Sequence, residues 1–150
     1  MEFRLEYFPA GSLANEVLFY AVMVSFHQGR LVCVRNKERT SWEFPAGRRE
    51  QGEGIHECAS RELVEETGAL DYDLSPAFEY AVVRQGIRTY GAVFLVEIHE
   101  FGELPDFEIA EVKLFDQLPA SLTYAEIQTQ LLKKTLKMFG LTWPIQKSNS

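Results

Sequence analysis

Apolar runs separated by short polar turns predict a β-hairpin near the start of the chain. The run 16–26, EVLFYAVMVSF, is rich in β-branched and aromatic residues and predicts a central strand. Gln28-Gly29 favours a turn after this run. Residues 31–34 are therefore expected to pair with the first strand.

A second hairpin is predicted further along the chain. Strands are expected at 77–84 and 87–98, with Gln85-Gly86 as the turn between them. Residues 99–107 contain Gly102 and Pro105 and lack periodicity, which predicts a loop.

Between the hairpins, the apolar spacing changes to that of a helix. At about 100° per residue, one inward stripe forms, and Gly68 would end the helix. The stripe consists of Ile55, Cys58, Ala59 and Leu63.

Three glutamates share this helix. Glu62 and Glu66 fall inside the apolar stripe, and Glu65 lies on its edge. Buried carboxylates imply a bound cation, a raised pKa or dense hydrogen bonding, whereas a solvated acidic face would need none of these. We favour a metal ion. Arg61 is placed to pair with Glu57 or Glu65 at i±4.

A final helix is predicted near the C-terminal end. The motif TYAE at 123–126 matches a capping box, and Gly140 would end the helix. Its amphipathic face comprises Ile127, Leu131, Leu132 and Met138. We expect this face to pack on the core.

Composition limits the classes of protein. A chain of 150 residues, 46% hydrophobic, predicts one domain over 1–145 with a frayed polar tail at 146–150. A net charge of −7 argues against binding long nucleic acid. Cys33 and Cys58 lie in apolar patterns and predict buried thiols in a reducing compartment. With no signal peptide or membrane span evident, we expect a soluble, cytoplasmic protein.

The acidic helix belongs to a longer pattern. Residues 47–69, GRREQGEGIHECASRELVEETGA, fit G-x5-E-x7-R-E-U-x-E-E-x-G-U at all seven fixed positions. The sequence therefore resembles the Nudix hydrolase family. The last aliphatic position is occupied by Ala69, although Leu70 follows. The lead-in WEFPAG at 42–47 and the segment EIAEVKLF at 108–115 extend the likeness over roughly 17–119.

The resemblance implies an α/β fold, a Nudix-type α/β/α sandwich with a mixed β-sheet and a loop-helix-loop catalytic motif. It implies Mg²⁺ as the cofactor, with Mn²⁺ as an alternative. Metal ligands would come from Glu62, Glu65, Glu66 and the backbone carbonyl of Ala46, with Glu108 as a further candidate. Arg61 would orient the glutamates.

Two questions about roles stay open at this point. The general base is Glu62 by likeness to MutT-like members, or Glu108, with Glu111 less favoured. Glu53 either reaches the metal through water or holds the loop against the helix, and we favour the second role. His27, His56 and His99 show no ligand spacing.

The expected partner is a small nucleotide or a nucleoside-diphosphate-linked molecule. Arg35, Arg48 and Arg84 are candidate substrate-binding residues, with Arg49 and Arg88 as further cations. The favoured reaction is MutT-like hydrolysis of a (d)NTP or oxidised (d)NTP to NMP and PPi. Alternatives are an ADP-ribose or nucleotide-sugar pyrophosphatase, and a non-catalytic nucleotide-binding module. No membrane partner is expected, and a homodimer stays open.

Overall fold

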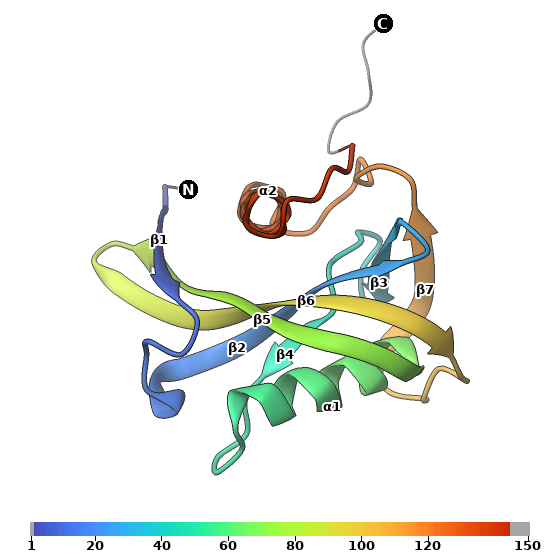
Figure 1. Cartoon of the computed structure of the whole chain (residues 1–150), viewed down its shortest axis with the longest axis horizontal. Helices are drawn as coiled ribbons and strands as arrows, with labels where there is room; N and C mark the ends of the chain where they lie inside the picture. The colour runs from blue at the N-terminus through green and yellow to red at the C-terminus, as the bar shows by residue number, and fades with distance from the viewer. Residues whose placement is uncertain (1, 145–150) are drawn as a thin grey trace, which may run out of the picture.

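The computed structural model describes residues 2–144, which form a twisted sheet with α1 on one face and α2 on the other (Figure 1). The elements are β1 (Arg4–Pro9), the 3-10 helix η1 (Asn15–Val17), β2 (Leu18–His27), β3 (Arg30–Asn36), β4 (Ala46–Arg48), α1 (Ile55–Thr67), β5 (Ala69–Arg84), β6 (Ile87–Phe101), β7 (Ile109–Phe115) and α2 (Ala125–Phe139). The predicted loop-helix-loop is present, with α1 between β4 and β5.

The sheet runs in the order β1-β5-β6-β2-β3-β7, and β4 pairs with β2 beside this path. β2 and β6 are parallel, whereas the other strand pairs are antiparallel. The predicted α/β/α sandwich with a mixed sheet is confirmed.

The central strand β2 is apolar on both faces because each face is covered by a helix. Ala21 and Met23 belong to the core cluster on the α1 side. Val22 and Val24 belong to the cluster on the α2 side. Coverage of both faces explains the nearly continuous apolar run in the sequence.

β2 and β3 pair only beside their turn, through Phe26↔Leu31 and the next pair. Farther from the turn, residues 43–48 lie between them. Glu43 forms a bridge with Val34, the Met23 amide donates to the Pro45 carbonyl at 2.8 Å, and Ala46 pairs with Val22. This insertion places Ala46 beside the centre of the sheet.

Both predicted hairpin turns are confirmed. Gln28 and Gly29 have φ values of 51° and 79°, and Gln85 and Gly86 have 51° and 78°. Positive φ at both central residues is the geometry of a two-residue turn that matches strand twist.

The strand boundaries predicted from the sequence were incomplete. β1 was not predicted, yet it pairs with β5 from Arg4↔Val83 to Pro9↔Phe78. β5 begins at Ala69 instead of residue 77, and β6 continues to Phe101 into the predicted loop. The register shifts near Pro76 interrupt the alternation that would have revealed the full length of β5.

The helix α2 is present as predicted, but its capping box is wrong. The N-cap residue is Tyr124, at φ 49° and ψ 48°, and no side chain caps the helix. The Thr123 hydroxyl is instead paired with that of Ser41. Met138 is 49% exposed and does not belong to the buried face. Gly140 ends the helix at φ 64°, as expected.

The structure tests some of the expectations about the whole chain and leaves others as predictions. The frayed tail was predicted for 146–150, which lies outside the described residues. Cys33 and Cys58 are free and buried, as expected. Within residues 2–144, none of the helices has the length and apolar character that a membrane crossing requires.

Candidate active site

The start of α1 is fixed by Asn15 and Glu57, neither of which is a fixed position of the acidic motif. Asn15 accepts a hydrogen bond from the Ile55 amide at 2.7 Å and donates one to the Glu53 carbonyl at 3.0 Å. The Glu57 carboxylate accepts from the Gly54 amide at 3.1 Å. Glu57 therefore satisfies a free amide at the helix start instead of pairing with Arg61.

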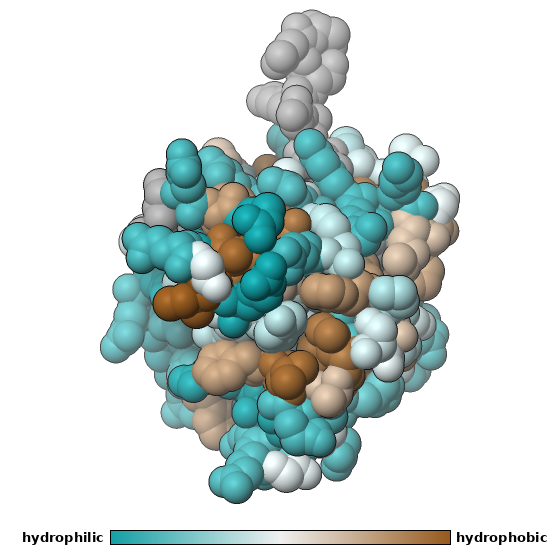
Figure 2. All heavy atoms as spheres, turned by 90° about the vertical axis from the view of Figure 1, so that its left-hand side faces the viewer, coloured by the Kyte–Doolittle hydropathy of each residue, from teal (hydrophilic) through white to brown (hydrophobic). Residues whose placement is uncertain are grey.

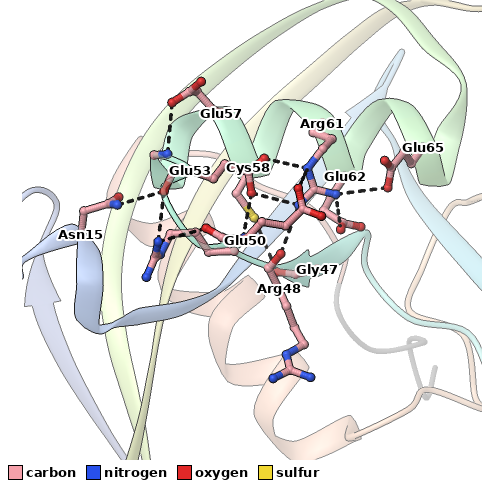
Figure 3. Close-up of polar contacts among 12 residues, drawn as sticks. Asn15, Gly47, Arg48, Glu50, Glu53, Glu57, Cys58, Arg61, Glu62 and Glu65 are labelled. Atoms are coloured by element: carbon pink, nitrogen blue, oxygen red, sulfur yellow. Dashed lines mark hydrogen bonds and ion pairs between the residues drawn. The ribbon is translucent and has the colours of Figure 1, made fainter.

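Arg61 lies among the acidic side chains of the motif (Figure 3). Its Nε and Nη2 donate to the Glu53 carboxylate at 2.6 and 3.0 Å. Its Nη1 donates to Glu62 at 2.8 Å and to Glu65 at 3.3 Å. The guanidinium thus holds three carboxylates in fixed relative positions, and the expected Glu65 pairing is confirmed.

Glu53 joins the loop to the helix. Besides Arg61, its carboxylate accepts from the Glu50 amide at 3.0 Å. The hydrogen bonds from Arg61 lower the pKa of Glu53 to about 2. These contacts support the loop-holding role that we favoured over a water-mediated metal contact. Arg49 also holds this loop, donating to the carbonyl oxygens of Leu18 and Glu53.

Glu62 and Glu66 lie on the inner side of α1, as their helical positions predicted. The Glu62 side chain is 15% exposed, compared with 36% for Glu65. Gly47 permits this placement, because a Cβ there would lie 2.0 Å from Cδ of Glu62. Burial raises the pKa of Glu62 despite the opposing effect of Arg61.

Glu66 is the more electrostatically strained of the two carboxylates. It accepts a hydrogen bond from the Ala46 amide at 3.0 Å. Burial raises the pKa of Glu66 to about 8, the Ala46 amide opposes this shift, and the charges of Glu62, Glu43 and Glu108 add to it. A buried carboxylate in a negative field favours either a proton or a cation.

The donor chemistry of this cluster fits a hard divalent cation. Magnesium prefers oxygen ligands, and carboxylates are the side chains offered here. Within residues 2–144, no group of three His, Cys, Asp or Glu side chains has the spacing of a complete metal site. Arg61 contacts Glu62 and Glu65, so these two would turn toward an ion to join Glu66. The ligand roles of Ala46, Glu62, Glu65, Glu66 and Glu108 therefore stay predictions.

Glu108 lies immediately before β7 and is exposed. Its backbone carbonyl accepts from the Lys37 amide at 2.8 Å. Its charge contributes to the raised pKa of both Glu62 and Glu66. The fold thus brings this distant carboxylate to the acidic cluster. Glu111, the less favoured candidate, pairs with Arg35 at 3.4 Å.

A cavity of about 340 Å³ opens on the α2 side of the sheet beside Ala46. Its aromatic lining includes Tyr20, Tyr80 and Tyr124, and its charged lining comes from Glu43 and Arg84. The sequence had singled out Arg84 as a candidate for substrate contact, whereas Tyr20, Glu43 and Tyr124 were missed. For Tyr20 the only local signal was the alternation of strand residues, which does not reveal what covers the face. Glu43 lies in an isolated bridge and Tyr124 precedes α2, so neither belongs to an alternating strand.

The three predicted substrate-binding arginines lie in different places. Arg84 lines the cavity. Arg48 points away from α1, and its guanidinium stacks on Phe19 at 4.4 Å (Figure 3). Arg35 pairs with Glu111 and is not part of the cavity lining. The structure therefore places Arg84 at the cavity, whereas Arg35 and Arg48 are not part of its lining.

The sequence model of the NUDIX domain family matches residues 17–134. The chain belongs to this family. The family assignment and the expected enzyme class, a hydrolase acting on phosphoric anhydride bonds, are confirmed at the level of the family.

Individual relatives of this NUDIX protein share only limited sequence identity with it. The mRNA-decapping enzyme subunit 2 of Arabidopsis thaliana is 31% identical over 98 residues, which span 61% of this chain and 26% of that protein. The chain thus covers a minor part of that relative.

Two solved structures illustrate the shared fold. A mutant form of the Bacillus subtilis pyrophosphohydrolase BsRppH superimposes with a TM-score of 0.77 and 22% identity, covering 92% of this chain and 89% of that one. The MutT NUDIX hydrolase from Burkholderia pseudomallei has a TM-score of 0.59 and 21% identity, covering 77% of this chain and 95% of that one.

The link between Glu53 and Arg61 predicts a pH-dependent contribution to stability. The folded-state pKa of Glu53, about 2, lies below its ordinary value of 4.5. The contribution is therefore fully present above pH 4.5 and is lost as the pH falls toward 2. We expect Glu53→Gln to lower the free energy of unfolding by ~1–2 kcal/mol at about pH 7. The difference in unfolding free energy between the variant and the wild type should shrink as the pH falls from 4.5 toward 2. Urea unfolding of both proteins across this pH range measures the difference, and a difference that does not change with pH would contradict the prediction.

Proposed function

We propose that this chain is a magnesium-dependent pyrophosphohydrolase that cleaves a nucleoside di- or triphosphate derivative. The favoured reaction converts a (d)NTP or an oxidised (d)NTP to NMP and PPi. One observation carries the proposal: Ala46 contacts the partly buried Glu66 carboxylate and also lines the cavity of about 340 Å³. Carboxylates suited to a cation and a pocket suited to a nucleoside therefore lie side by side.

Hydrolysis requires a water molecule to approach phosphorus that is already surrounded by negative oxygens. Bound magnesium would neutralise those oxygens and lower the pKa of a coordinated water. Glu66 and Glu62 would hold the ion, together with Glu65 and the Ala46 carbonyl. We assign proton abstraction to Glu62, whose raised pKa brings it closer to the operating pH of a general base. Glu108 is the alternative base.

Arg61 and Glu53 would keep the acidic side chains in place during turnover. The guanidinium holds Glu53 through two hydrogen bonds, so it is anchored to the loop that precedes α1. Its weaker contact with Glu65, at 3.3 Å, is the one more readily exchanged for a cation. Arg61 thus acts as a positioning residue.

The cavity supports nucleoside binding through its aromatic and apolar walls. Tyr20 and Tyr80 come from the sheet, and Tyr124 precedes α2. Aromatic rings can stack on a base, and a few polar groups can orient it. On the face that carries the β5–β6 turn, apolar surface is divided into small groups among hydrophilic side chains (Figure 2). The proposed partner, to which the cavity is suited, is a small molecule; dimerisation stays a prediction open to test.

We predict that Glu62→Gln lowers turnover by about 10²–10⁴-fold, the effect of losing a positioned base. The amide is nearly isosteric, so folding should persist. Pyrophosphate-release kinetics and circular dichroism measure the two effects. Glu126→Gln, an exposed change in the first turn of α2, is the matched control and should retain activity. Undiminished turnover in Glu62→Gln would remove Glu62 from the mechanism.

Magnesium should stabilise the folded chain, because an ion bound only by the folded state raises its stability. We expect a higher melting temperature with Mg²⁺ or Mn²⁺ and reversal by EDTA. Glu66→Gln removes a buried charge while keeping an acceptor for the Ala46 amide. This variant should therefore be at least as stable as wild type without metal and should lose most of the metal response. An unchanged metal response would argue against Glu66 as a ligand.

A substrate screen separates the favoured reaction from its alternatives. Nucleoside triphosphates and oxidised dNTPs would release pyrophosphate, whereas ADP-ribose and nucleotide sugars would release two monophosphates. Hydrolysis of the second group alone would replace the favoured reaction by the alternative pyrophosphatase. Binding of nucleotides without any turnover, with magnesium or manganese present, would favour the non-catalytic module.

A further inference from the structure

Arg84 is the last residue of β5, and its side chain lines the cavity. Its Nε is the one buried side-chain nitrogen or oxygen without a hydrogen-bond partner in the described part of the chain. The guanidinium carbon lies 5.8 Å from the centroid of the Phe3 ring, so an aromatic face supports it on one side. A buried donor without an acceptor is unfavourable. The Nε itself is covered, so a ligand in the cavity would meet the outer N–H groups of the guanidinium.

The other charged residue of the cavity does not fill this role. Glu43 is 3.6 Å from Arg39 in an i,i+4 ion pair. It also lies close enough to Glu66 for its charge to raise the pKa of that residue. Glu43 therefore belongs to the end of the cavity near the acidic cluster.

Arg84 belongs to the opposite end. Ala46 lies on β4, which pairs with β2; β2 pairs with β6, and β6 pairs with β5. Three strand spacings of about 4.8 Å separate β4 from β5, giving roughly 14 Å across the sheet. The strand partner of Ala46 on β5, reached through Val22 and Val93, is Phe78, so Arg84 also lies about 20 Å farther along β5 at ~3.3 Å per residue. Its long side chain reaches back toward Ala46, because both residues line the same cavity. A nucleotide with its phosphates near Ala46 would therefore extend its base toward Arg84.

The floor between these ends is shaped to receive a flat ring. Tyr20, Gly91 and Tyr80 lie in one row across β2, β6 and β5. The Tyr80 ring lies against Gly91, where a Cβ would be 2.6 Å from the ring carbon Cζ. Beyond Tyr80 on the same side of β5 come Val82 and Arg84, both part of the lining. A base stacked on this floor would present one edge to the guanidinium.

Guanidinium groups only donate hydrogen bonds, so they select an edge that only accepts. Guanine presents O6 and N7 as adjacent acceptors, whereas adenine presents N7 beside an amino donor. Oxidation of guanine at C8 places a proton on N7 and removes that acceptor. We propose that Arg84 makes the pocket selective for the unoxidised guanine edge. This proposal rests on the proposed function and narrows its substrates to guanine nucleotides that are not oxidised at C8.

Substrate analogues test the acceptor pair directly. Wild-type kcat/KM should be similar for GTP and ITP, which share O6 and N7. It should be about 10–100-fold lower for ATP, for 7-deaza-GTP, which lacks N7, and for 8-oxo-GTP, since a good bidentate contact discriminates on this scale. Equal kcat/KM values for GTP, ATP and 7-deaza-GTP would overturn the proposal.

Variants assign the selectivity to Arg84. Arg84→Gln should lower kcat/KM for GTP and ITP while leaving that for ATP nearly unchanged, and Arg84→Lys should not restore the preference because it lacks the planar fork. Arg88→Gln is the matched control, since Arg88 is exposed on the same hairpin and pairs with Glu6 at 2.7 Å. An equal proportional loss for all bases in Arg84→Gln, or the same loss of preference in Arg88→Gln, would contradict the assignment.

A binding measurement separates this proposal from the proposed hydrolysis. Calorimetric titration of the Glu62→Gln protein with GTP and ATP requires no turnover. Tighter binding of GTP, lost on adding Arg84→Gln, would support base selection even if the catalytic assignment failed. Equal affinities for GTP and ATP would overturn it even if both nucleotides were hydrolysed by the wild-type protein.

Discussion

Electrostatic pairing around Arg61 sets the arrangement of the acidic residues in the NUDIX motif. Without that guanidinium, Glu53, Glu62 and Glu65 would repel one another across the loop and the helix. Glu66 is held differently, by the amide of Ala46. The outer carboxylates are thus balanced by a permanent cation, and the inner one retains an unbalanced charge. This asymmetry leaves the deepest carboxylate with the strongest preference for a metal ion.

The separation of β2 from β3 gives the site its second component. Because these strands pair only near their turn, residues 43–48 can approach the middle of the sheet. Ala46 then faces the acidic helix through its amide and the cavity on the α2 side. Residues 43–48, of which 46–48 pair with β2, thus connect the acidic helix to the cavity. Their relative position is therefore set by sheet hydrogen bonding instead of loop flexibility.

Local periodicity was sufficient to predict α1 and the inward direction of Glu62 and Glu66, because both depend on neighbours within two helical turns. It was not sufficient for β1, a short strand ending in proline whose pairing with β5 is long-range. Nor did it reveal the left-handed backbone at Tyr124, where the motif TYAE had predicted a capping box. Likewise, Arg84 and Arg48 look equivalent along the sequence, and only the register of distant strands separates them.

Gly91 shows how the size of such a pocket can be encoded apart from its chemistry. Its backbone does not occupy the left-handed region, so residues with side chains are conformationally allowed there. What forbids them is the Tyr80 ring, which a single added methyl group would displace. Variation at this one position could redraw the cavity while leaving every residue of the acidic helix untouched. Substrate range and hydrolytic machinery can accordingly diverge on independent evolutionary paths.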